Sequence, residues 1–243
     1  MNLGLGGKVA LVTGGARDVG REISLTLARE GAAVAVNYLH SKAEADALVA
    51  EIVRLGGRAA AYGADVADHG AVSRMVARIV SDLGRLDVVV NNAGLVAPKL
   101  FLETTPEEWR REVDVCLYGV FNVCHAAAPK LAAQKGGRII SIVGDSARVG
   151  QQRLGVSAGA RGAVLSLTRT LAKEFGRLDI TVNALASAGS RPRTPTRNGS
   201  RRIASVFSPS TRSGGSGSPT TWRRSSPFSP PTSPVGSPGR RSA

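Results

Sequence analysis

The sequence predicts a three-layer α/β fold, in which helices cover both faces of a doubly wound parallel sheet. Short apolar segments of strand length alternate with longer segments of helical length over about residues 8–183. The first apolar segment also leads into a glycine-rich turn at residues 13–20. Strands that are joined by helices run parallel, and the connecting helices cover both faces of the sheet.

The first half of the predicted sheet contains three strand–helix units. Its strands are expected at residues 8–13, 33–38 and 58–63. The first helix follows the glycine-rich turn and continues to Glu30. The second, about residues 42–55, stops at Gly56-Gly57, and the third, residues 68–83, stops at Gly84. Glycine after a helix is a typical stop signal because it adopts a left-handed conformation without strain.

Three more strands complete the predicted sheet. They are expected at residues 86–90, 138–143 and 179–183. Between the first two, Thr105-Pro106 has the pattern of a helix start, with a capping threonine and proline at the first helical position. The helical region after it is expected to run to about Gln134, and a last helix is expected over residues 156–175. The sheet is therefore predicted to end with its sixth strand.

The composition changes after Ala186. Residues 187–243 contain ten arginines, no lysine and no acidic residue, and more than half are Gly, Pro or Ser. Such a segment buries too little apolar surface to offset the entropy of ordering. We therefore predict a domain over residues 1–186 and a disordered tail over residues 187–243. The domain has 22 basic and 18 acidic residues, or +4, so the net charge of +14 comes mainly from the tail and indicates no specific nucleic-acid partner.

The cysteines and the apolar segments indicate the cellular compartment in which the protein is expected. Cys116 and Cys124 have neither disulfide nor metal-ligand spacing, so reduced thiols and no metal site are expected. The apolar run at residues 9–12 is too short for a signal peptide, and no segment is long enough to cross a bilayer. These observations predict a cytoplasmic protein that is not a membrane protein.

Two motifs that follow predicted strands indicate a dinucleotide site. Residues 13–20 read TGGARDVG between a strand and a helix, where glycines let the backbone approach a pyrophosphate and the helix N-terminus offers N–H groups. Residues 91–94 read NNAG at the end of the fourth strand. Together they resemble the TGxxxGxG and NNAG motifs of the short-chain dehydrogenase/reductase family, in particular its 3-oxoacyl reductase-like members. The resemblance covers about residues 5–186.

This resemblance implies a Rossmann-type fold, an NAD(P) cofactor, and redox chemistry between a carbonyl and an alcohol on a small-molecule substrate. It places the cofactor against the glycine-rich turn, the ends of the second, third and fourth strands, and the last helix. The implied cofactor-binding residues are Gly14, Arg17, Asp18, Val19, Gly20, Asn37, Asp65, Val66, Asn92, Ala93, Gly94 and Arg161.

The choice between NAD and NADP depends on the end of the second strand. Residues 37–40 read NYLH and contain no carboxylate to accept the ribose hydroxyls of NAD. Arg17, or alternatively His40 or Lys42, can face a 2′-phosphate, so NADP(H) is expected rather than NAD(H). Asp18 stands where the family pattern has its middle glycine, and its carboxylate either repels a pyrophosphate or caps the following helix.

The family's catalytic positions are all substituted. The family uses a Tyr as acid/base, a Lys four residues later, a Ser after the fifth strand and an Asn in the preceding helix. The surrounding motifs place these positions at Ser157, Arg161, Gly144 and Cys116, respectively. An aliphatic hydroxyl is far less acidic than a phenol with a pKa of about 10, and Arg does not reproduce the geometry of Lys. The chain is therefore either an oxidoreductase with altered chemistry or an inactive nucleotide-binding protein or partner subunit.

The family's C-terminal pattern is missing from residues 187–243. However, the codons that can encode residues 219–234 can also be read in another frame, starting from the third base of each codon. That frame is compatible with the sequence DDVAAVVAFLASDLA, which resembles the family pattern DvAxxvxFLaSdxA. We hypothesise that residues 187–243 are a shifted-frame translation of that pattern. The sixth strand would then be an exposed edge, which disfavours the family's homo-oligomer and favours nonspecific association. The substrate cannot be read, because the family's substrate loop lies in this region.

Overall fold

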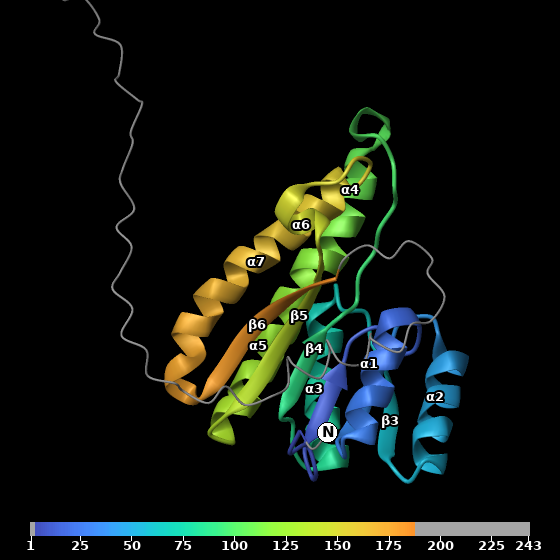
Figure 1. Cartoon of the computed structure of the whole chain (residues 1–243), viewed down its shortest axis with the longest axis vertical. Helices are drawn as coiled ribbons and strands as arrows, with labels where there is room; N and C mark the ends of the chain where they lie inside the picture. Colours follow the sequence, from blue (N-terminus) through green and yellow to red (C-terminus); the bar gives the residue numbers. More distant parts are fainter. Residues whose placement is uncertain (1–2, 188–243) are drawn as a thin grey trace, which may run out of the picture. The chain divides into compact units, whose positions relative to one another are not determined.

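Six parallel strands form one sheet in the computed structural model, which describes residues 3–187. The strand order is β3-β2-β1-β4-β5-β6, as predicted for a doubly wound sheet (Figure 1). The strands are β1 (Val9–Val12), β2 (Ala33–Tyr38), β3 (Arg58–Gly63), β4 (Val88–Asn91), β5 (Gly137–Gly144) and β6 (Ile180–Ser187). The predicted disordered tail lies outside the described residues, apart from Ser187 at the end of β6.

Most helices follow the strands as predicted. These are α1 (Asp18–Arg29), α2 (Lys42–Arg54), α3 (His69–Leu83), α4 (Pro106–Val113), α5 (Gly119–Ala133) and α7 (Gly155–Phe175). The short helix α6 (Ser146–Val149) was not predicted. Three short helices, η1 (Phe101–Glu103), η2 (Asp114–Tyr118) and η3 (Gly176–Leu178), were not predicted. The chain builds β2 and β3 on one side of β1 and then crosses to β4, β5 and β6 on the other. This reversal creates a switch point between β1 and β4, where ligands bind in such sheets.

The core has two parts, one on each face of the sheet. Successive side chains of a strand point to opposite faces. Accordingly, Val9 and Leu11 pack in the cluster that includes α3, α5 and α7, whereas Ala10 and Val12 pack in the cluster that includes α1 and α2. The continuous apolar character of β1 is therefore explained by burial on both faces.

Several helix ends confirm the sequence signals. Thr105 and Glu108 form a capping box at the start of α4, since the threonine hydroxyl accepts from Glu108 N at 3.4 Å and the Glu108 carboxylate accepts from Thr105 N at 3.0 Å. The carboxylate of Asp68 caps α3 by accepting from Ala71 N at 2.9 Å. Gly84 ends α3 with a φ of 88°.

The single helical region predicted from residue 105 to 134 is wrong in one respect. A π-helical turn, η2, separates α4 from α5. Within it, the Cys116 thiol lies 3.4 Å from the backbone nitrogen and 3.2 Å from the carbonyl oxygen of Leu95. Just beyond it, a Cβ on Gly119 would lie 2.8 Å from Val66 Cγ2, so α5 passes close to the segment after β3. These tertiary contacts accompany the π-helical turn, which no local residue pattern predicts.

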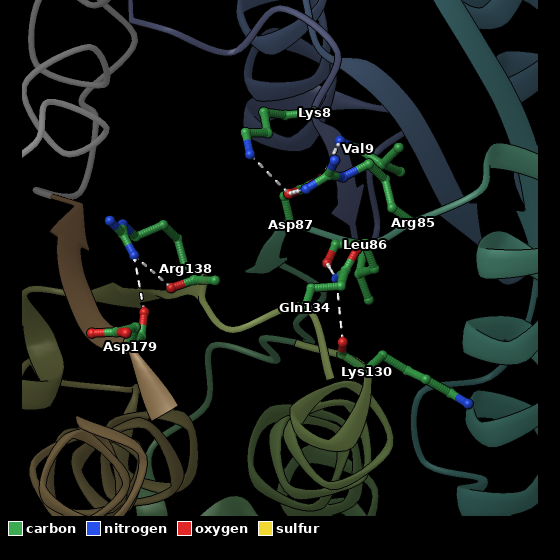
Figure 2. A network of polar contacts seen from close by, with 10 residues as sticks. Lys8, Val9, Arg85, Leu86, Asp87, Lys130, Gln134, Arg138 and Asp179 are labelled. Carbon is green, nitrogen blue, oxygen red and sulfur yellow. Dashed lines mark hydrogen bonds and ion pairs between the residues drawn. The ribbon is translucent and has the colours of Figure 1, made fainter. Parts of the chain in front are cut away.

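An ionic cluster joins the amino ends of β1 and β4 (Figure 2). The buried Asp87 carboxylate accepts from Val9 N at 2.9 Å and from Arg85 at 2.7 and 2.6 Å, and Lys8 lies 3.3 Å away. Burial alone would raise the pKa of Asp87, but these hydrogen bonds and charges outweigh it and hold the pKa below its ordinary value. The cluster lies at the edge of the sheet opposite the switch-point cleft and fixes the strand ends.

Membrane insertion was not expected from the sequence. Across residues 3–187, none of the helices combines the length and apolar character that a bilayer span requires.

Candidate functional site

A cleft of about 1020 Å³ opens at the carboxyl ends of the strands, beside the switch point. The turn after β1 and the residues after β2, β3 and β4 line it, together with Gly144 at the end of β5 and Arg161 on α7. All twelve residues predicted to bind the cofactor line this one cleft. The structure thus brings together segments that lie as far apart in the sequence as Gly14 and Arg161.

The glycine-rich turn has a conformation that requires glycine at two of its positions. Gly14 has a φ of 58°, and its N–H donates to the Asn37 side-chain oxygen at 3.2 Å. A Cβ on Gly20 would overlap the carbonyl oxygen of Gly14 and would lie 2.6 Å from Asn92 Nδ2. Glycine is therefore required at residue 20 because the first turn of α1 packs directly on the backbone of the loop.

Thr13 and Asn92 connect the two motifs. Thr13 was not among the site residues predicted from the sequence. The Thr13 hydroxyl oxygen accepts from Asn92 N at 2.9 Å and from Ala93 N at 3.0 Å. In return, Asn92 Nδ2 donates to the carbonyls of Thr13 and Gly14 at 3.0 and 3.1 Å. The turn after β1 and the turn after β4 therefore form one bonded unit. Its role could have been inferred from the sequence, because Thr13 is the first residue of the glycine-rich motif.

Asn37 lines the cleft but is bonded within the protein. Its side-chain nitrogen donates to the carbonyls of Tyr62 and Ala64 at 3.2 and 3.0 Å, while its oxygen accepts from Gly14 N. Its side chain is buried and ties the ends of β2 and β3 to the turn. Asn37 therefore positions the site, and its side chain has few atoms left for a ligand.

The segment after β3 is fixed in a similar way. Asp65 accepts from Ala67 N at 2.9 Å, and Asn122 on α5 donates to the carbonyls of Val66 and Ala67 at 2.9 and 3.1 Å. Asn122 was also missed from the sequence, where it is one polar residue within a largely apolar helix. It places Asp65 and Val66 at the wall of the cleft.

The structure bears on one of the two interpretations of Asp18, that its side chain caps the following helix. This residue is the first of α1 and has a φ of 48°, a conformation that is uncommon outside glycine. The N-cap is Arg17, and no side-chain capping hydrogen bond is formed. The capping interpretation is therefore wrong, because the Asp18 side chain is exposed at the cleft instead of bonding the helix N-terminus.

The candidate 2′-phosphate ligands separate into two groups. Arg17 and His40 line the cleft, and Arg17 is exposed. Lys42 does not line the cleft, and its ammonium pairs with Asp46 at 2.5 Å one turn along α2. The alternative that used Lys42 is thus disfavoured, because its charge is already engaged on an exposed helix face.

Of the four residues expected at the family's catalytic positions, only two line the cleft. Gly144 and Arg161 line it, whereas Ser157 and Cys116 do not and are each 3 % exposed. Ser157 lies one helical turn before Arg161 on α7. The Arg161 guanidinium lies against Gly94, since a Cβ there would overlap Nη2 and lie 3.3 Å from Cζ. Arg161 therefore places a guanidinium beside the 91–94 turn at the cleft wall.

The second cysteine is a buried neutral thiol. Burial raises the pKa of Cys124 to about 11, although a hydrogen bond from Asn91 Nδ2, at 3.5 Å, opposes this shift. Asn91 Nδ2 also donates to Ser141 Oγ at 3.3 Å. A thiol with this pKa is not a nucleophile at neutral pH.

The fold and the cleft define a dinucleotide-binding α/β protein, because a glycine-rich turn and a helix N-terminus meet at the switch point of a doubly wound sheet. Comparison with known proteins gives the family: the family model described as short chain dehydrogenase matches residues 8–202. The chain belongs to this family, whose members are NAD(P)-dependent oxidoreductases, as the resemblance of its motifs indicated.

Individual relatives agree with this assignment. The 3-oxoacyl-(acyl-carrier-protein) reductase of Staphylococcus aureus strain Mu50 is 41% identical over 179 residues, which cover 74% of this chain and 73% of the relative. Hydroxynaphthalene reductase of Aspergillus fumigatus is 40% identical over 187 residues, covering 77% and 68%.

Solved structures share the fold. A dehydrogenase/reductase from Sinorhizobium meliloti 1021 has a TM-score of 0.74 and 35% identity, covering 78% of this chain and 75% of that structure. A gluconate 5-dehydrogenase from Burkholderia cenocepacia J2315, in complex with NADP and tartrate, has a TM-score of 0.73 and 30% identity, covering 77% and 73%.

Proposed function

We propose that the chain is an NADP(H)-binding oxidoreductase of the carbonyl/alcohol, 3-oxoacyl reductase-like type, in which substituted catalytic positions slow turnover. The single observation that carries this proposal is the cleft at the switch point. Its glycine-rich turn, the NNAG turn and Arg161 all face one space. Membership of the short chain dehydrogenase family supports the reaction class.

The shape of the cleft fits a dinucleotide. Gly14 and Gly20 pack so closely on neighbouring protein atoms that a Cβ on either would lie about 3.1 Å or less from them, so both positions require glycine. Glycines at these places in the motif are typical of a turn that binds a pyrophosphate. The N-terminus of α1 supplies N–H groups, because Arg17 provides no side-chain cap. Gly14, Val19, Gly20 and the 92–94 segment would hold the phosphates and the nicotinamide ribose.

NADP is favoured by residues that follow β1 and β2. Arg17, after β1, and His40, after β2, both line the cleft, and no carboxylate occurs at residues 37–40. The relative solved with NADP and the 3-oxoacyl reductases are consistent with this preference. Asp18 opposes it in part, since its exposed carboxylate repels phosphate. We expect NADP⁺ to bind more tightly than NAD⁺, with Arg17→Gln removing most of the difference.

The chemical step lacks a suitable proton donor among the mapped residues. Reduced nicotinamide supplies a hydride when bound. The alcohol that forms also needs a proton, and the Ser157 hydroxyl is buried and too weakly acidic to give one. Gly144 has no hydroxyl to orient a carbonyl, and a guanidinium is not a proton donor in proteins. Loss of a general acid typically reduces rates by about 10²–10⁴-fold.

A restoration experiment tests this proposal. NADPH oxidation would be followed with β-ketoacyl thioesters, ketones and quinones for the parent and for a variant carrying Ser157→Tyr, Arg161→Lys, Gly144→Ser and Cys116→Asn. We expect the parent to be about 10²-fold slower or more. Ser157→Ala and Arg161→Ala provide the complementary test in the parent. Rapid parent turnover that survives both changes would contradict the assigned positions.

An inactive nucleotide-binding protein is the second candidate, favoured by the burial of Ser157 and Cys116 away from the cleft. It predicts NADPH binding without turnover on any substrate of the panel. We also propose that the sequence of residues 187–243 arose by a shift of reading frame. Resequencing of codons 184–220 tests this origin, and an intact frame in related strains would contradict it.

A further inference from the structure

Two histidines from different helices lie side by side at the surface. His69 is the first residue of α3, and His125 lies near the middle of α5. His69 Nε2 lies 3.2 Å from His125 Nδ1, and the two ring centroids are 5.2 Å apart with their planes inclined at 53°. Both residues are exposed. The two rings therefore present nitrogens to each other at a place that solvent and small ions can reach.

Hydrogen bonds fix the backbone that carries the two rings. The Asp68 carboxylate caps α3 directly before the first histidine. Asn122 lies one turn before His125 on α5. It donates to the carbonyls of Val66 and Ala67 at 2.9 and 3.1 Å, just before that cap. Because α5 is bonded to the segment that leads into α3, a ligand that bridges the two histidines does not have to bring them together.

The separation of the two nitrogens matches the spacing of two ligands on one metal ion. Zn²⁺–N bonds of about 2.0–2.1 Å at a tetrahedral angle place two nitrogens about 3.3–3.4 Å apart. The observed 3.2 Å is close to this value. It is also the distance of a hydrogen bond, in which a neutral ring accepts from the other ring. A metal ion would replace the shared proton, and the rings would need only to rotate, because their nitrogens already lie at ligand spacing.

The chemistry of the two side chains selects a class of metal. Neutral imidazole is a good ligand for Zn²⁺ and related transition metals, whereas Mg²⁺ and Ca²⁺ prefer oxygen ligands. Within residues 3–187, no group of three or more His, Cys, Asp or Glu side chains is suited to a metal ion. Residues 188–243 contain none of these residue types. Water would therefore complete a tetrahedral Zn²⁺, and the site should bind less tightly than a structural site with four protein ligands.

We propose that His69 and His125 form a surface site for Zn²⁺ that links the start of α3 to α5. Neither histidine lines the switch-point cleft, so the site is separate from it and the inference does not depend on the proposed function. A bound ion would connect two helices through residues that lie 56 positions apart in the sequence. Since the two ligands meet only in the folded chain, Zn²⁺ would stabilise the folded state.

Calorimetric titration with ZnCl₂ tests the proposal in the full chain without an affinity tag. We expect one Zn²⁺ to bind per chain, and MgCl₂ should give no binding. His69→Gln and His125→Gln should each weaken Zn²⁺ binding at least about tenfold, because even the loss of a group that only orients a metal ligand costs that much. His40→Gln is the matched control, since His40 is the third histidine of the chain and lines the cleft instead. It should bind Zn²⁺ as the parent does.

Thermal unfolding gives a second measurement. Zn²⁺ should raise the Tm of the parent and of His40→Gln, but not that of His69→Gln or His125→Gln. Circular dichroism establishes that each variant is folded. Absence of saturable Zn²⁺ binding by the parent would overturn the proposal without any variant. Parent-like affinity in either folded His69→Gln or His125→Gln would also overturn it, because the ion would then be bound elsewhere.

Discussion

The Asn92 side chain donates a hydrogen bond to the backbone carbonyl of Gly14 at 3.1 Å, across the switch point of the sheet. It makes a second bond, of 3.0 Å, to the carbonyl of Thr13. Both acceptors belong to the turn that would face a pyrophosphate. Asn92 therefore connects the end of β4 to the shape of the phosphate turn.

Replacing this amide should affect both stability and cofactor binding. Asn92→Ala removes two hydrogen bonds, and we expect a loss of about 1–2 kcal/mol in the free energy of unfolding together with weaker NADP⁺ binding. Urea denaturation and calorimetry measure the two effects. Gln152→Ala, an exposed change in the loop before α7, is the control. Unchanged NADP⁺ affinity in a destabilised Asn92→Ala protein would show that the turn does not depend on this residue.

The close packing at Gly20 predicts a larger effect on the turn. In Gly20→Ala the added methyl group would overlap the Gly14 carbonyl oxygen, so the turn must open and NADP⁺ binding should be lost. Gly159→Ala is a matched control in α7, because a Cβ there meets nothing within 4 Å. That control should be stabilised by up to about 1 kcal/mol. Equal NADP⁺ affinities for both variants would contradict the assigned role of the turn.

Asp87 should make the stability of the fold depend on pH. Although burial disfavours the carboxylate, its bonds to Arg85 and Val9 hold the pKa below the ordinary value. A depressed pKa in the folded state stabilises the protein above the unfolded-state pKa, about 3.9, and that contribution is lost as pH falls through the folded-state pKa.

Substitution of Asp87 tests this dependence. Asp87→Asn should lower the free energy of unfolding by about 2 kcal/mol at neutral pH, and its deficit should shrink in acid. Denaturant titrations at several pH values measure the deficit. Asp46→Asn removes an exposed pair with Lys42 and should cost far less. A deficit that is independent of pH would refute the ionic explanation.

Cys124 should resist modification in the folded protein. Burial raises its pKa to about 11, so the reactive thiolate is scarce at neutral pH. Cys116 is also buried, with its thiol bonded to Leu95. Labelling with a disulfide reagent should therefore follow unfolding. Rapid labelling in the native state, assigned by Cys116→Ala and Cys124→Ala, would instead identify an accessible thiol.

Much of the fold could be predicted because it follows from local patterns. Apolar segments such as residues 33–38 coincide with a strand, and the capping residues at 105–108 coincide with a helix start. Predictions failed where tertiary contacts decide the outcome. The π-helical turn around Cys116 depends on contacts with Leu95, and the sequence offers no local sign of it.

The same distinction applies to the site. Motif residues such as Gly14 and Asn92 were identified from the sequence and share one cleft. The hydroxyl of Thr13 was missed, because its partners lie in a segment almost eighty residues away. The contact between the Arg161 guanidinium and Gly94 also required the structure, since the two residues lie in segments that only the fold brings together.

Calorimetric titration of the full chain with NADP⁺ and with NAD⁺ directly tests whether the cleft binds a dinucleotide. We expect saturable binding of one dinucleotide per chain, with NADP⁺ the tighter ligand and Gly20→Ala unable to bind. Absence of binding by both dinucleotides to a folded parent protein would contradict it.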